Sequence, residues 1–492
     1  MKFWKHLGIA AAVLVLPAGG LAQVPLGEPR SGSDHRDAAQ APYLRGLALL
    51  HNFEYPRAAK AFREAQAADP AFVMGYWGEA MTYNHPVWME QDTQTARAVL
   101  ARLGATAAER QSRASNERER GYLQAIDALY GEGSKEERDR AYSKRMADLA
   151  ARHPDDVDAG AFYALSLLGL AHQGRDYGLY MRSAAVLEEL YPANLRHAGV
   201  LHYMIHSYDD PIHAPLGLRA ARRYADVASD APHALHMTSH IFLMQGMWDD
   251  VISSNQAASA AARRLHASVR QAQSSCGHFA QWLVYGLYQR ERNTEARAMT
   301  SACLGEARSA RAGQMPHDST GQDWSSLTSW ADMAVRGSIE TGERPRLEGM
   351  DLSGPQFARV RFTLAYADLI TAGTDLSRIR IARSQLSSVD GVLKGQPEPS
   401  HASRRRGIIL AQARGLELLR TGEVEPGLAE LRRAAELERA MPVESGPPLV
   451  EKPSFELLGD ELWRLRRHSE AREAYRAALD LTPGRRLSSG NH

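Results

Sequence analysis

The chain has 492 residues, and its 59 lysines and arginines are balanced by 58 acidic residues, which gives a net charge of +1. This balance argues against a nucleic-acid partner, because binding to the phosphate backbone needs a surplus of basic side chains. The two cysteines, Cys276 and Cys303, are too few for a cysteine-rich zinc site or a c-type haem. Whether they form a disulfide, as an oxidising compartment would allow, stays open at this point.

The N-terminal segment 1–22 has the pattern of a secretory signal peptide. Lys2 and Lys5 precede an apolar run over 7–16, and small residues lead up to a predicted cleavage after Ala22. The residue directly after this point is Gln23 and not a cysteine, so a lipid anchor is not expected. No later apolar run approaches the roughly 20 residues that span a bilayer. We therefore expect a periplasmic or secreted protein without a transmembrane segment.

The rest of the chain is predicted to consist of helical pairs that repeat with a period of about 34 residues. Runs rich in Ala, Leu, Arg and Glu recur between short Gly, Pro and Asp breaks. Gly46 and Phe62 take positions 8 and 24 of one such unit, and Gly459 and Tyr475 take the same positions of another. This period is typical of tetratricopeptide-type hairpins, which bury a core by stacking, and it predicts an all-α solenoid.

Four segments follow from this pattern. They are the signal peptide over 1–22, an N-terminal repeat array with a histidine-rich groove over 23–304, an irregular connection over 305–356 and C-terminal repeats over 357–492. The connection is expected because Gly, Ser and Pro are scattered among short helical pieces there. The proline-rich stretch 441–453 is expected to be an extended loop, because proline cannot continue a helix.

Histidines recur at the spacing of the repeat. His202 and His206 fall at positions 2 and 6 of one first helix, and His236 and His240 fall at the same positions of the next. Positions 4, 7, 8 and 11 of the first helix carry the residues that pack inside the hairpin. At 100° per residue, positions 2 and 6 lie about 120° to 180° around the helix from these packing positions. The side chains should therefore face away from the hairpin core and toward the concave wall that solenoids use for binding.

Three further histidines fit the same pattern. His51 and His85 are separated by one repeat period, both at position 13 of their predicted helices, and His278 falls at position 2 of a later unit. We expect all three to line the groove. The alternative is that the histidines are a mixture of hydrogen-bonded core residues and surface residues.

Pairs of histidines four positions apart on a helix present two imidazoles to one point, as paired zinc ligands do. Two neighbouring pairs, His202 with His206 and His236 with His240, could thus form a four-histidine cluster for a divalent transition metal such as zinc, copper or iron. Neither pair contains the glutamate of an H-E-x-x-H motif, so a zincin-type protease is not expected.

Four other residues are candidates for the groove. Asp209 and Asp210 follow His206 and could supply an oxygen ligand or a base, although capping of the next helix explains Asp210 equally well. Glu79 is close to His85 in sequence and is a second possible oxygen donor. Lys452 lies in the proline-rich loop and could close over the groove.

Several runs resemble a family of exported bacterial tetratricopeptide repeat proteins of unassigned function. They are 49–55, 75–81, 85–88, 206–218, 233–242, 282–285 and 446–459. The resemblance implies the repeat fold but no reaction, and its motifs contain the same histidines. An amino-terminal cysteine motif common in that family is absent, and Thr238 stands where proline is common, so no cysteine chemistry is carried over.

Two functions remain open from the sequence. The first is a binding module whose groove holds a peptide, a protein segment or a small molecule. The second is a metal-dependent protein, such as a hydrolase or an oxygenase, with imidazoles from neighbouring repeats as ligands and Asp209 or Glu79 as oxygen donors. The repeat pattern alone does not decide between them, because function depends on the site.

Overall fold

A computed structural model describes residues 26–28, 37–268, 275–309, 326–345, 350–395 and 400–490. The predicted signal peptide and its cleavage point at Ala22 lie outside these residues. The described part of the chain is almost entirely helical, with one pair of very short strands.

The elements follow in chain order. The N-terminal part contains α1 (Asp37–His51), α2 (Tyr55–Ala68), α3 (Val73–Met81), β1 (Asn84–His85), η1 (Pro86–Trp88), β2 (Glu90–Gln91), α4 (Thr93–Leu103), α5 (Ala107–Ser112), α6 (Glu117–Leu129), α7 (Lys135–Arg152), α8 (Val157–Leu168), α9 (Tyr177–Leu190), η2 (Tyr191–Ala193), α10 (Ala198–Tyr208), α11 (Ala214–Val227), α12 (Pro232–Leu243) and α13 (Trp248–Ser268). The C-terminal part contains α14 (His278–Gln289), α15 (Asn293–Ser309), α16 (Ser326–Thr341), η3 (Pro355–Phe357), α17 (Ala358–Ile370), α18 (Leu376–Leu393), α19 (Ser400–Arg420), α20 (Val424–Arg439), α21 (Ser454–Arg464), α22 (His468–Leu481) and α23 (Arg486–Ser489).

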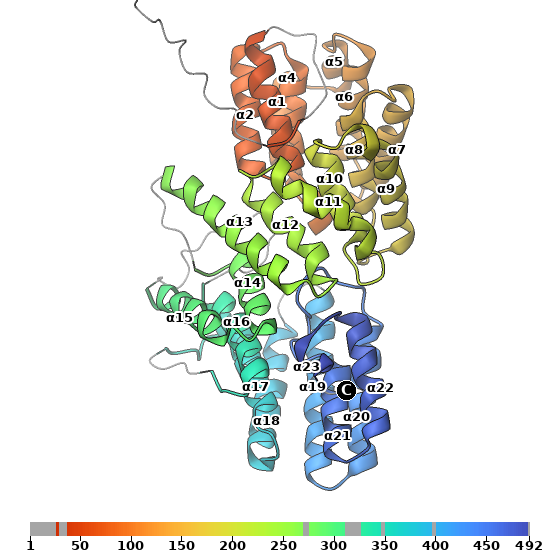
Figure 1. Cartoon of the computed structure of the whole chain (residues 1–492). Helices are drawn as coiled ribbons and strands as arrows, with labels where there is room; N and C mark the ends of the chain where they lie inside the picture. The colour runs from red at the N-terminus through yellow and green to blue at the C-terminus, as the bar shows by residue number, and fades with distance from the viewer. Residues whose placement is uncertain are drawn as a thin grey trace, which may run out of the picture.

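Consecutive helices pack as antiparallel hairpins, and the hairpins stack into a superhelix (Figure 1). The first helices of successive hairpins also touch, as α8, α10 and α12 do. The chain is therefore an all-α solenoid, as the sequence predicts. Its C-terminal end contacts the middle of the array, where the indole nitrogen of Trp248 donates a hydrogen bond to the backbone oxygen of Gly484.

The packing inside a hairpin explains why glycine and an aromatic residue recur at fixed positions. A Cβ on Gly46 would lie 2.8 Å from the ring of Phe62, and a Cβ on Gly459 would lie 2.7 Å from the ring of Tyr475. The two helices of each hairpin can approach this closely only because the glycine has no side chain. This contact is the tetratricopeptide-type packing that the repeat pattern predicts.

Replacing Gly459 with alanine should lower the free energy of unfolding by about 1 to 3 kcal/mol, because the new methyl group overpacks the contact with Tyr475. Gly407 is a control on α19, where a Cβ would meet nothing within 4 Å. There alanine should raise stability by about 0.5 to 1 kcal/mol through helix propensity. Denaturant unfolding of both variants tests this, and equal effects of the two substitutions would contradict it.

The predicted irregular connection over 305–356 contains a well-packed helix. Helix α16 buries Trp330, Met333 and Val335 and packs against both α15 and α17. The scattered glycines and serines of this region obscured its helical apolar spacing. By contrast, the proline-rich stretch has no helix between Arg439 and Ser454, as expected.

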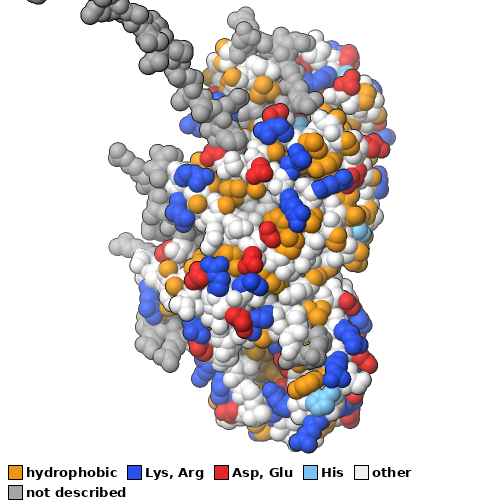
Figure 2. All heavy atoms as spheres, in the orientation of Figure 1, with side chains coloured by type: hydrophobic (Ala, Val, Ile, Leu, Met, Phe, Trp, Pro, Cys, Tyr) orange, Lys and Arg blue, Asp and Glu red, His pale blue; other side chains and the backbone are white. Residues whose placement is uncertain are grey.

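Cys276 and Cys303 form a disulfide, which ties the residues just before α14 to α15. Within the described ranges, none of the helices combines the length and the apolar character that crossing a bilayer requires. On the face shown in Figure 2, acidic and basic side chains are interspersed and few histidine atoms reach the surface.

Candidate metal centre

Two pairs of histidines lie at equivalent positions on neighbouring first helices. His202 and His206 belong to α10, His236 and His240 belong to α12, and the two helices pack against each other. The ring centroids are 4.8 Å apart in the first pair and 5.0 Å apart in the second. The structure thus places the four side chains as the helical turn and the repeat period imply.

The four rings do not make one cluster, because each pair is completed by a different third histidine. Group one consists of His202, His206 and His233, and group two consists of His236, His240 and His278. In each group, one potential ligand atom from every residue lies within 4.8 Å of the others. We call the two groups together the histidine centre. His233, one turn before His236, does not follow the repeat spacing, and no sequence pattern singled it out.

Four of the six histidines of the centre are buried, and His233 and His278 are half-buried, which corrects the expectation of an open groove. His202 and His236 have no exposed surface, and His206 and His240 are only 5% and 6% exposed. Aromatic side chains cover them, including Trp282, whose ring lies 4.4 Å from that of His240.

Two of the histidines also contact their own hairpins: the ring of His202 stacks on that of Tyr224 of α11 at 5.3 Å, and the Nδ1 of His236 contacts Asn255 of α13 at 2.7 Å. The expectation that these side chains face away from the hairpin core is therefore wrong, and neighbouring elements close over them as well.

Phe53 is the main cover of group one. Its ring lies 4.3 Å from that of His202, 5.7 Å from that of His206 and 5.6 Å from that of His233. The residue sits in the turn between α1 and α2 with a φ of 55°. This left-handed conformation is unfavourable for a bulky residue and is kept only where the surroundings hold it. The turn therefore adopts an unfavourable conformation that directs an aromatic ring at the three imidazoles.

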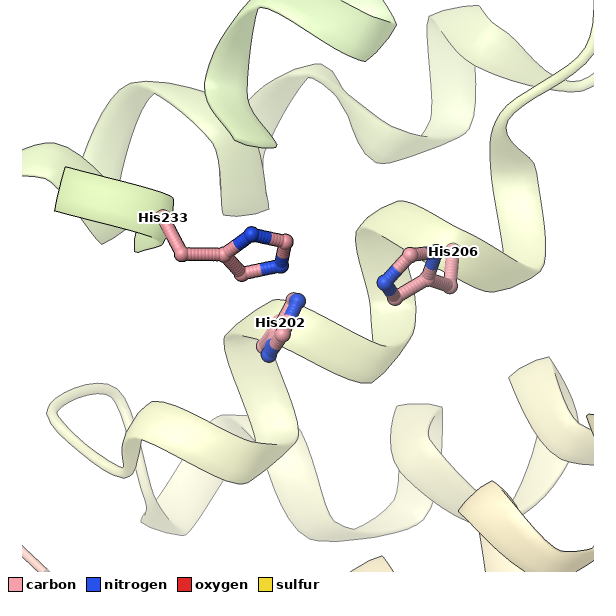
Figure 3. Close-up of side chains that lie close together, drawn as sticks. All are labelled: His202, His206 and His233. Atoms are coloured by element: carbon pink, nitrogen blue, oxygen red, sulfur yellow. The ribbon is translucent and has the colours of Figure 1, made fainter. Parts of the chain in front are cut away.

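The hydrogen bonds of group one leave ring nitrogens without partners. The Nδ1 of His202 lies 2.7 Å from the backbone oxygen of His51, and because a carbonyl only accepts, this nitrogen must carry the proton. The lone pair of a neutral ring is then on Nε2. The Nε2 atoms of His202, His206 and His233 are all buried without a hydrogen-bond partner. Figure 3 shows the three rings converging from α10 and α12.

Group two shows the same orientation. The Nδ1 of His236 donates to the side-chain oxygen of Asn255, and the Nδ1 of His240 donates to a carboxylate oxygen of Asp209, at 2.7 and 2.6 Å. The two Nε2 atoms then face each other at 3.1 Å. Two lone pairs repel at this distance, so the contact requires a proton or a metal ion. Two nitrogens on one tetrahedral zinc would be about 3.3 Å apart.

Burial keeps most of these rings neutral at pH 7. It lowers the pKa well below the usual 6.5 for His202, His206, His233 and His236, and it lowers the pKa of His278 to about 3. Burial alone would raise the pKa of Asp209, but the nearby His240 and Arg175 outweigh it and lower that pKa. Five of the six imidazoles therefore favour the neutral form that binds metal ions.

A third group has the right residue types for a metal but lacks free lone pairs. The ring nitrogens of His51 contact Asp158 at 2.7 Å and the hydroxyl of Tyr203 at 2.9 Å. His197 contacts the same carboxylate at 3.0 Å and accepts a hydrogen bond from the backbone of Val200. Both histidines use both nitrogens within the protein. We therefore interpret this group as a structural network and not as a metal site.

Glu79 does not reach the histidine centre. It is buried between α2, α3 and α4, where it forms ion pairs with Arg63 and Arg102 and accepts a hydrogen bond from Gln66 at 2.7 Å. These partners satisfy both carboxylate oxygens. Glu79 therefore ties three helices together, and its predicted role as an oxygen donor to a metal is not supported.

His85 lies in β1 and not on a helix, because α3 ends at Met81. Its ring stacks on Tyr55 at 4.1 Å, and its Nε2 contacts the backbone oxygen of Thr82 at 3.1 Å. It is thus part of the aromatic layer beside group one and does not belong to either group.

Asp210 and Lys452 also have structural partners. Asp210 accepts hydrogen bonds from the backbone nitrogens of Ile212 and His213 and pairs with Arg175, so it holds the turn before α11 and does not cap that helix. Lys452 is only 6% exposed, and its Nζ lies 2.9 Å from a carboxylate oxygen of Glu456 on α21, in the C-terminal part of the array. It does not close over a groove.

Comparisons with known proteins concern the fold alone. No protein-family model matches the chain, and no curated protein matches it. Similar solved structures include the Cut9–Hcn1 hetero-tetramer of the APC/C, with 10% sequence identity and a TM-score of 0.33. That alignment covers 94% of this chain and 77% of the matched chain. Yeast Tom70 has 11% identity and a TM-score of 0.32 over 92% and 95% of the two chains. The TPR domain of P58(IPK) has 11% identity and a TM-score of 0.22 over 92% and 96%.

Proposed function

We propose that this protein binds transition metal ions in the histidine centre, on a scaffold of stacked helical hairpins. The observation that carries the proposal is the set of three buried Nε2 atoms, on His202, His206 and His233, that lack any hydrogen-bond partner. Buried polar atoms are almost always paired, so three such atoms within one small group favour a common ligand. A metal ion satisfies all three lone pairs at once.

The outer contacts of the rings support the same proposal. Histidines that bind metals through one nitrogen usually donate the other N–H to a carbonyl or a carboxylate, which fixes the ring. His202, His236 and His240 donate from Nδ1 to a backbone carbonyl, an amide oxygen and a carboxylate respectively. Imidazole donors suit zinc, copper, iron and nickel, so the ligand is a metal of this class.

A peptide or small molecule is a less suitable partner for these histidines. A ligand of that size needs an open surface, whereas Phe53 and Trp282 cover the rings. Stacked hairpins are nevertheless a scaffold that commonly binds proteins or peptides on its concave face. Such binding would use side chains outside the histidine centre.

We also propose that the protein works in the periplasm or outside the cell. The signal-peptide pattern before Ala22 supports this location, and the disulfide between Cys276 and Cys303 fits an oxidising compartment.

Metal analysis tests the proposed function. Protein purified without a chelator or a nickel affinity tag should contain zinc, copper or iron in stoichiometric amount. The His202→Ala variant should lose most of the metal bound by group one, because removal of a direct ligand weakens a three-ligand site by more than about 100-fold. His197→Ala is the matched control, because it also removes a buried histidine but one whose lone pair is used within the protein.

The control separates loss of metal from loss of folding. Both variants should melt at a lower temperature than the native protein, but only His202→Ala should lose metal. Equal metal content in all three proteins, or no metal in any of them after incubation with zinc and copper, would refute the proposal.

A further inference from the structure

The two histidine groups touch each other. The ring of His206 in group one lies 6.1 Å from that of His240 in group two, and the ring of His233 lies 6.3 Å from that of His236. Imidazole rings at these separations are in contact, so no other side chain fits between the groups at either point. The two groups are therefore in direct contact and are not two distant sites.

Five of the rings form a closed loop of neighbouring rings. In order, the centroids are 4.8 Å apart from His202 to His206, 6.1 Å to His240, 5.0 Å to His236, 6.3 Å to His233 and 5.1 Å back to His202. A metal bound to a ring nitrogen lies about 3.2 Å from the ring centroid, given a bond of about 2.1 Å. One ion cannot reach five rings in a loop of this size, but one ion in each group can lie beside the other.

The charges of neighbouring side chains limit which ions can bind in the histidine centre. The negatively charged Asp209 accepts a hydrogen bond from His240. The positively charged Arg175 lies next to His206 and donates a hydrogen bond to its backbone oxygen at 3.2 Å. The cost of burying an ion increases with the square of its charge. A pair of divalent ions would carry four positive charges beside one carboxylate, whereas a pair of monovalent ions would carry only two.

The number of donors leads to the same class of ion. Each group supplies three imidazoles, whereas zinc takes four ligands in its usual sites and would need an additional one. Copper(I) is monovalent, binds imidazole and accepts three ligands. We propose that the histidine centre is a dinuclear site for two copper(I) ions, each held by the three histidines of one group. This inference rests on the proposed metal-binding function.

Anaerobic titration tests the inference. Metal-free protein titrated with copper(I) in competition with a coloured copper(I) chelator should bind two ions per chain, and zinc should not displace them. Oxidation with two equivalents of ferricyanide gives two copper(II) ions. Their electron paramagnetic resonance signal should account for much less than the copper present, because neighbouring copper(II) ions couple.

Variants in the two groups complete the test. His233→Ala and His278→Ala each remove one ligand from a different group at a half-buried position. Each should bind one copper ion, whose signal after oxidation accounts for all of it. His468→Ala, at the start of the distant helix α22, should behave as the native protein does.

Three results would overturn the inference. They are a single copper ion in the native protein, a full signal from two uncoupled copper(II) ions, and displacement of copper(I) by zinc. Each of these leaves metal binding by the histidines intact. Failure to bind either metal would instead refute the proposed function itself.

Discussion

Loading the metal-free protein with its metal should raise the free energy of unfolding by about 4 kcal/mol for each bound ion when the free metal is about 1,000 times its Kd. The reason is that the ligands come from α10, α12 and α14 and converge only in the folded chain. Denaturant unfolding in a metal buffer measures the shift. Tryptophan fluorescence is a suitable signal, because the chain has eight tryptophans and the indole of Trp282 lies 4.4 Å from the ring of His240.

The effect should depend on the histidine centre alone. In the His202→Ala, His240→Ala double variant, both groups lose a ligand, and the same metal concentration should then change stability only slightly, because it no longer exceeds the Kd by much. The His197→Ala control should keep the full shift, although its metal-free stability is lower. Equal stabilisation of the double variant and the native protein would mean that the metal binds elsewhere.

Replacing Arg485 with methionine should lower the free energy of unfolding by about 3 to 5 kcal/mol. This arginine has no exposed surface and joins α23 to the rest of the C-terminal array. It donates two hydrogen bonds to Glu456 at 2.7 and 3.0 Å and pairs with Glu340 at 2.9 Å. Methionine would leave both carboxylates buried with fewer positive partners.

The pKa of Glu456 supports the size of this effect. Burial alone would raise it, but Arg485 and Lys452 outweigh burial and lower it to about 2. Arg472 on α22 is the matched control, because its side chain is exposed. Its replacement by methionine should change stability by less than about 0.5 kcal/mol. Similar losses for the two variants in denaturant unfolding would show that the buried network contributes little.

The repeat period predicts the fold because it reports contacts inside each hairpin. Gly46 with Phe62 and Gly459 with Tyr475 are local pairs with the same sequence separation, and their packing is repeated along the chain. Helix α16 was missed for the opposite reason. Its Gly337 meets Tyr288 of α14, a pair whose sequence separation differs from the 16 residues between Gly46 and Phe62 in the regular units.

The candidate site was only partly predictable. The helical turn and the repeat period identified the four histidines on α10 and α12, because both intervals are fixed by the geometry of stacked hairpins. Burial depends on Phe53 and Trp282, which come from the α1–α2 turn and from α14 and have no fixed spacing to those histidines. The distinction between His202, which has an unpaired nitrogen, and His51, which has none, is visible only in the hydrogen bonds.

The most direct test is a crystal structure of the metal-loaded protein with diffraction recorded on both sides of the absorption edge of the metal. We expect an anomalous difference peak within about 2.1 Å of the Nε2 atoms of His202, His206 and His233. A second peak beside His236, His240 and His278 would support the dinuclear site. Fully loaded crystals with no peak at either group, or with the metal on surface residues alone, would contradict metal binding by the histidine centre.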